Sequence, residues 1–162
     1  MNRSVWAIAA LLFAVVQSVS AAKADWQYTK WGMSLDEVIA ASKLQMERCD
    51  GACAKLSTDA EFAGATGPYQ SGPFDFKAVA YFDRKTSRLS SVLLYLKDVD
   101  QAFRLQDELK AKYGRPASNM DVSVTRTTVW LTDTERVEFS LIYKALVSVK
   151  YQPRLTASNK GL

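Results

Sequence analysis

The two cysteines are the residues whose chemistry is easiest to define. Cys49 and Cys53 enclose the segment Asp50-Gly51-Ala52, and a turn at Asp-Gly would bring the two sulfurs together. An even number of cysteines in an exported chain is typical of a disulfide. A bridge across so short a loop is expected to stabilise the fold by about 2 kcal/mol. We therefore predict a structural disulfide.

Two other uses of the same cysteine pair stay open. Thiol–disulfide catalysts usually have two residues between their cysteines and place them at a helix N-terminus. Here the spacing is three, and the pair follows a predicted helix. A thiol-redox or metal-handling factor that uses Cys49 and Cys53 is therefore the alternative to the structural interpretation.

Histidine is absent from the chain. Its absence excludes Ser-His and Cys-His nucleophile pairs and histidine-ligated zinc, copper and haem. The sequence also has no glycine-rich phosphate loop, nucleophile elbow or metal-ligand spacing. We therefore predict a protein that is not an enzyme and needs no cofactor or metal. A hydrolase that relies on carboxylates brought together by the fold is the remaining enzymatic alternative.

Aromatic side chains are the candidates for ligand binding. Most of the Trp and Tyr residues are expected to pack in the core or on a sheet face. Tyr69 lies between the turn-forming pairs Gly67-Pro68 and Gly72-Pro73, so it is predicted to occupy a loop, where recognition residues are frequent. Tyr69 and Trp31 form the predicted binding surface. On this prediction, Tyr69→Ala would abolish binding without loss of stability.

The first 24 residues predict export. Arg3 is followed by an uninterrupted apolar run from Val5 to Val16 and then by small residues, which is the order of a secretory signal peptide. Cleavage is predicted after Ala24. The apolar run is shorter than the roughly 20 residues that a membrane-spanning helix needs. We therefore expect a periplasmic or secreted protein with no stable membrane anchor after cleavage.

The charge balance favours a protein partner over nucleic acid. The net charge of +4 includes Arg3 and Lys23 of the signal segment, and 19 basic and 17 acidic residues remain without them. These remaining charges are mixed along the chain, whereas nucleic-acid binding requires a concentrated basic stripe. We therefore expect another envelope protein as the partner and no nucleic acid.

Two helices are predicted. Ser34 and Glu37 have the spacing of a capping box and precede a helix over about 35–44. Asp98 and Gln101 repeat this spacing before a second helix, which has one apolar stripe and ends before a Gly and a Pro.

Five segments have the alternation that is typical of strands with one solvated face: 74–82, 89–96, 122–131, 137–143 and 146–152. A short edge strand is predicted within 25–32. The segment 49–73 contains six turn-forming Gly and Pro residues and is predicted to be a loop.

Together these elements predict one α+β domain over 25–152, with a flexible tail at 153–162. Two helices would pack on one face of an antiparallel sheet of five to six strands. A capped helix followed by a loop and a hairpin occurs at 34–96 and again at 98–152. We therefore consider a degenerate helix–hairpin duplication.

Two motifs support a resemblance to small bacterial envelope proteins. Trp31-Gly32-Met33-Ser34, followed by Val38, resembles the helix start of the SmpA/OmlA-type lipoprotein of the barrel-assembly machinery and of the β-lactamase-inhibitor-like fold. Tyr113-Gly114-Arg115-Pro116, followed by a strand with Trp130, is similar to a later segment of these modules. The resemblance implies helices on one face of an antiparallel sheet whose other face can meet a partner protein. This chain lacks the lipidated cysteine of that lipoprotein, so a role in barrel assembly is not predicted.

These observations lead to one functional prediction. The chain is expected to be an exported, non-enzymatic binding or protein-interaction module of unknown specificity. The alternative is the thiol-redox or metal-handling factor described above.

Overall fold

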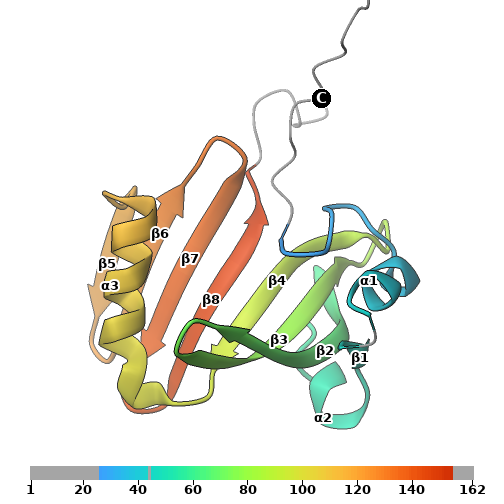
Figure 1. Cartoon of the computed structure of the whole chain (residues 1–162), viewed down its shortest axis with the longest axis horizontal. Coiled ribbons are helices and arrows are strands. Elements are labelled where there is room, and N and C mark those ends of the chain that lie inside the picture. The colour runs from blue at the N-terminus through green and yellow to red at the C-terminus, as the bar shows by residue number, and fades with distance from the viewer. Residues whose placement is uncertain (1–25, 44, 155–162) are drawn as a thin grey trace, which may run out of the picture.

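The computed structural model describes residues 26–43 and 45–154, and the following description applies to this part of the chain. The predicted signal peptide, its cleavage position Ala24 and nearly all of the predicted tail at 153–162 lie outside it. Figure 1 shows one twisted antiparallel sheet accompanied by helices, so the fold belongs to the predicted α+β class.

Eight strands form the sheet in the order β1-β2-β3-β4-β8-β7-β6-β5. Their bounds are β1 Glu47–Arg48, β2 Glu61–Ser71, β3 Phe74–Asp83, β4 Leu89–Leu96, β5 Ser118–Val122, β6 Thr125–Leu131, β7 Glu135–Ile142 and β8 Leu146–Pro153. The helices are α1 Leu35–Ala41, α2 Gly51–Ala54 and α3 Ala102–Tyr113, and α3 is preceded by a 3-10 turn, η1 Val99–Gln101. Every helix in the described part is too short or too polar to cross a bilayer.

The capping box of α1 is present as predicted. The Ser34 hydroxyl accepts a hydrogen bond from the backbone N–H of Glu37, and the Glu37 carboxylate accepts one from the backbone N–H of Ser34. Each side chain thus satisfies a backbone donor that the helix leaves unpaired. The helix ends at Ala41, three residues before the predicted end.

The main core lies between the sheet and the helices α1 and α3. Side chains that alternate along β3, β4, β7 and β8 point towards these helices, which contribute Val38 from α1 and Leu105 and Leu109 from α3. The Gln106 amide also donates a hydrogen bond to the Thr128 hydroxyl, which ties α3 to β6 at 3.1 Å. The opposite face carries a smaller apolar cluster near α2: Cys53, Ala63, Val79 and Tyr81.

The sheet consists of two similar halves. In the first half, α1 is followed along the chain by the meander β2-β3-β4, and in the second half α3 is followed by β6-β7-β8 after the edge strand β5. The last strands of the two meanders pair with each other at the centre, from Val92–Tyr151 to Tyr95–Ser148. In the first half, β2 adds a strand to the predicted hairpin, and the helix–hairpin duplication stays a prediction.

The sheet has eight strands, so the prediction of five to six was wrong. The largest error is at 49–73, where the structure has the short helix α2 and the long strand β2 in place of a loop. Glycine in β2 permits close packing and does not mark turns, because a Cβ at Gly64 would lie 2.6 Å from the Phe82 ring. Pro68 is tolerated because, beyond the two residues of β1, β2 is an edge strand.

Two smaller predictions were also wrong. The segment 122–131 is not one strand, because a turn at Ser123-Val124 separates β5 from β6. Ser123 takes a positive φ of 55° there, which is uncommon for a residue other than glycine and gives no signal in the sequence. The edge strand predicted within 25–32 is replaced, over the described residues 26–32, by turns.

Candidate functional site

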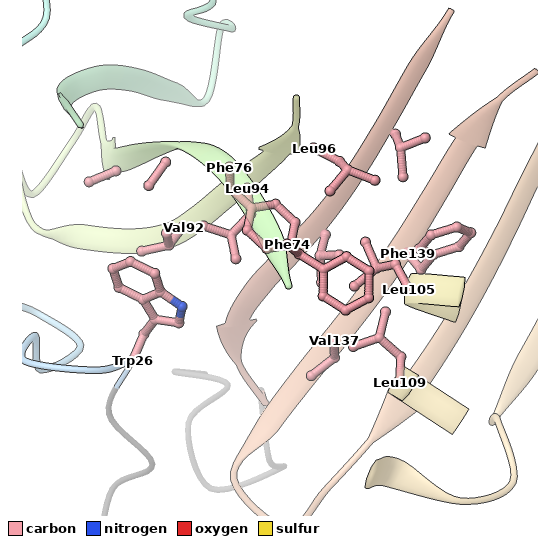
Figure 2. Packing of buried hydrophobic residues seen from close by; sticks show 14 of the residues in the cluster. Trp26, Phe74, Phe76, Val92, Leu94, Leu96, Leu105, Leu109, Val137 and Phe139 are labelled. Carbon is pink, nitrogen blue, oxygen red and sulfur yellow. The ribbon is translucent and has the colours of Figure 1, made fainter. Parts of the chain in front are cut away.

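A cavity of about 370 Å³ opens on the helix-covered face of the sheet. It lies between α3, the β2–β3 hairpin and the N-terminal segment, with β4 and β8 as its floor. Figure 2 shows Trp26 on one side, Leu105 and Leu109 of α3 on the other, and Phe74 and Leu94 between them. The cavity exists because α3 covers only part of this face and leaves the middle of the sheet accessible.

Local interactions hold the walls in place. The Thr29 hydroxyl donates a hydrogen bond to the backbone carbonyl of Trp26 at 2.8 Å. This bond closes the turn that begins at Trp26. The N–H of Gly32 donates to the carbonyl of Leu89, so the N-terminal segment is fixed to β4. The β2–β3 turn contains Gly72 with a φ of +55°, a backbone conformation that glycine adopts without strain.

Three tyrosines from different elements converge on the cavity: Tyr69 of β2, Tyr113 of α3 and Tyr151 of β8. The Gln27 amide donates a hydrogen bond to the Tyr69 hydroxyl at 2.7 Å. Burial raises the pKa of Tyr151, and the neighbouring Tyr113, Tyr69 and Glu135 raise it further. The Tyr151 phenol is therefore neutral at physiological pH and can donate or accept a hydrogen bond.

Charged side chains lie at the cavity as well. Glu108 and Lys112 line it from α3, and Glu135 lines it from the start of β7. The Lys112 ammonium lies 4.9 Å from the centre of the Tyr113 ring, which is a cation–π contact. The site thus combines apolar walls, phenol hydroxyls and a small number of charges.

Tyr69, which the sequence singled out, lines the cavity, but it does not lie on a loop. It is part of β2, and its ring packs 5.2 Å from Trp26 and 6.0 Å from Phe76, centre to centre. Truncation to alanine would therefore remove core packing, so we now expect Tyr69→Ala to lower stability as well as to alter the cavity. Trp31 packs against the core and does not line the cavity.

Sequence reasoning missed most of the cavity. Trp26, Tyr113 and Tyr151 were assigned to an edge strand, a helix stripe and a final strand, and nothing in their spacing indicates that they meet. The available signal was the aromatic type of these residues, but aromatic residues are also the usual filling of a core.

The cysteine pair lies on the opposite face of the sheet. The structure places Cys49, which follows β1, and Cys53 of α2 at disulfide distance, with their Cα atoms 5.2 Å apart, a normal separation for a bridge. Cys53 is only 7% exposed and packs against Val79 and Tyr81. This burial limits access of an attacking thiolate to Cys53 and favours a structural role. Within the described residues, no cluster of three or more His, Cys, Asp or Glu side chains could hold a metal ion.

Comparisons with known proteins give little further information. No protein-family model matches the chain, and no curated protein matches it. Among solved structures, it is similar to a DUF4309 family protein, YjgB, from Bacillus subtilis subsp. subtilis str. 168. That match has 13% sequence identity and a TM-score of 0.44 and covers 74% of this chain and 77% of the other. Neither fold nor function is inferred from so low a similarity.

Proposed function

We propose that this protein is a non-enzymatic binding module that works in the periplasm or outside the cell and holds a small ligand with both apolar and polar groups. The observation that carries the proposal is the cavity between α3 and the β2–β3 hairpin. Its volume of about 370 Å³ lies within the range of small-molecule sites. The predicted signal peptide supports the location.

The polar groups of the cavity suit binding better than catalysis. A general base must be able to take up a proton near the working pH, whereas the raised pKa of Tyr151 keeps its phenol protonated. The Tyr69 hydroxyl already accepts a hydrogen bond from Gln27. These hydroxyls are therefore suited to orienting a ligand that the aromatic walls hold.

A pair of tryptophan variants on α3 tests the proposal. Glu108 lines the cavity, so Glu108→Trp should obstruct its mouth, whereas its neighbour Asp107 does not line it. Asp107→Trp removes the same charge and adds the same side chain, and is therefore the matched control. We expect wild type and Asp107→Trp to bind a common set of aromatic fragments in ligand-observed NMR, and Glu108→Trp to lose at least about tenfold in affinity for them.

Two results would contradict the proposal. One is that the wild-type protein binds no fragment. The other is that Glu108→Trp retains the wild-type set with unchanged affinities, which would place the binding elsewhere on the molecule.

A further inference from the structure

We propose that β5 is an interaction surface for a second copy of this chain, so that two sheets join edge to edge in a twofold-symmetric dimer. The proposal goes beyond the cavity, because no residue of β5 lines that site. Three features of β5 carry it: its exposed and unprotected edge, the direction of its free backbone groups, and its complementarity to an antiparallel copy of itself.

The strand β5 is an exposed edge strand. It lies at the end of the strand order, so within the described part of the chain no strand pairs with its outer edge (Figure 1). All five of its residues are exposed, and Met120 and Val122 have exposed fractions of 58% and 59%. Edge strands are usually protected against further pairing by proline, by lysine or by a covering segment. β5 contains neither proline nor lysine, and the charge of Asp121 is paired with Arg126 of β6.

The opposite edge of the sheet has the protection that β5 lacks. Its long strand β2 contains Pro68, which has no backbone N–H to offer to a new strand. The two residues of β1 pair with β2, and the segment before β1 lies so close that a Cβ at Gly67 would collide with the Gln45 carbonyl. Of the two edges, β5 is therefore the one that is open to another strand.

The free backbone groups of β5 belong to Asn119 and Asp121. Val122 and Thr125 flank the two-residue turn between β5 and β6, so they form a hydrogen-bonded pair. Hydrogen-bonded and non-hydrogen-bonded pairs alternate along an antiparallel ladder, so Met120 also bonds to β6. Asn119 and Asp121 therefore direct their backbone N–H and C=O groups away from the sheet.

These free groups match an antiparallel copy of the same strand. When two β5 strands are centred on Met120, Asn119 of each copy lies opposite Asp121 of the other, and the two residues can exchange both backbone hydrogen bonds. The Asn119 side-chain amide can also donate a hydrogen bond to the facing Asp121 carboxylate. The two Met120 side chains meet at the twofold axis in a non-hydrogen-bonded pair, where side chains approach most closely, and bury each other's apolar surface.

A pair of cysteine variants tests this register. The two Met120 Cα atoms would lie about 4.5 Å apart, which is within the range of a disulfide. The two Val122 Cα atoms would lie about 14 Å apart, because each is displaced along its strand from the axis. Under mild oxidation we expect Met120→Cys to form a covalent dimer on a non-reducing gel, and the equally exposed control Val122→Cys to stay monomeric. Equal crosslinking of the two variants, or none in either, would overturn the proposed pairing.

A charge variant tests the dimer in solution. Met120→Lys places two ammonium groups opposite each other at the axis, so dimerisation should weaken at least about tenfold. Leu131→Lys adds the same charge to an exposed residue of β6 beyond the end of β5, and should leave dimerisation unchanged. Sedimentation equilibrium of the purified proteins from micromolar to millimolar concentration measures both effects. A wild-type protein that is monomeric over this whole range, or equal weakening by the two variants, would overturn the proposal.

Discussion

The charged side chain of Glu61 lies half-buried on the face of the sheet that is opposite to α1 and α3. Its carboxylate accepts hydrogen bonds from the hydroxyls of Ser90 at 2.6 Å and Ser91 at 2.9 Å, and forms an ion pair with Lys150 at 2.9 Å. Burial acts to raise the pKa of Glu61, but the hydrogen bonds and the Lys150 charge outweigh it, so the pKa lies below its ordinary value. Because Glu61 belongs to β2 and Lys150 to β8, this pair links the two halves of the sheet.

This lowered pKa predicts a dependence of stability on pH. The folded protein binds a proton at Glu61 less readily than the unfolded chain, whose carboxyl titrates near 4.5. The contribution of Glu61 is therefore present above about pH 4.5 and is lost as the pH falls through the folded-state pKa. In urea unfolding between pH 7 and pH 3, the free energy of unfolding of Glu61→Gln should fall less steeply than that of wild type.

The control for this prediction is Asp59→Asn, which alters an exposed acid two residues away. Its pH profile should be parallel to that of wild type. Parallel profiles for wild type and Glu61→Gln would contradict the assigned role of the Glu61 carboxylate.

At the scale of the element, β2 depends on the absence of side chains at two positions. A Cβ at Gly67 would collide with the backbone carbonyl of Gln45, and a Cβ at Gly64 would collide with the Phe82 ring. The segment before β1 therefore lies directly against β2, and this contact helps to position the strand that contributes Tyr69 to the cavity.

We expect Gly67→Ala to destabilise the protein by about 1–3 kcal/mol, because a backbone group must move to accommodate the methyl group. Chemical denaturation measures the effect directly. Gln70→Ala changes an exposed residue of the same strand and should stay within about 0.5 kcal/mol of wild type. A similarly small effect of Gly67→Ala would show that the two segments are not in close contact in solution.

Elements with one strong local signal could be predicted from the sequence. The capping box at Ser34 and Glu37 locates the start of α1, and alternation over 74–82 and 89–96 corresponds to β3 and β4. Segment 49–73 could not be predicted in this way, because its Gly and Pro residues were interpreted as turn formers. In β2, the glycines instead allow neighbouring groups to pack closely against the strand, and the proline lies at an edge of the sheet.

The cavity was beyond sequence reasoning for a different physical reason. Periodicity indicates which side chains face the core, but not whether the elements on that face meet. The cavity depends on the distance between α3 and the β2–β3 hairpin, which no local pattern encodes. Tyr69 was singled out because of neighbouring turn residues, although it lines the cavity as a strand residue.

At the scale of the whole molecule, the cavity and the cysteine pair lie on opposite faces of one sheet. The cavity is lined from both halves, by Phe76 and Leu94 of the first and by Val149 and Tyr151 of the second. The cysteines belong to the first half alone and pack against its other side. The sheet therefore lies between the cavity and the cysteine pair.

This separation predicts the effect of reduction. Breaking the Cys49–Cys53 bridge opens a short loop, so the free energy of unfolding should decrease by about 2 kcal/mol, while affinity for cavity ligands stays the same. Unfolding and ligand titrations with and without reductant measure the two effects, and Cys49→Ser/Cys53→Ser reproduces the reduced state. A redox factor would instead exchange its disulfide readily with glutathione at a potential close to that of its compartment.

The central position of β8 has a consequence for the order in which the sheet forms during synthesis. Among the described strands β8 comes last in sequence, yet it lies between β4 and β7, and its pairing with β4 joins the two meanders. During synthesis from the N-terminus, β2, β3 and β4 can pair first. The free edge of β4 then has no partner strand until β8, which contains residues near 150, has been made. The described sheet is therefore completed only after β8 has been synthesised.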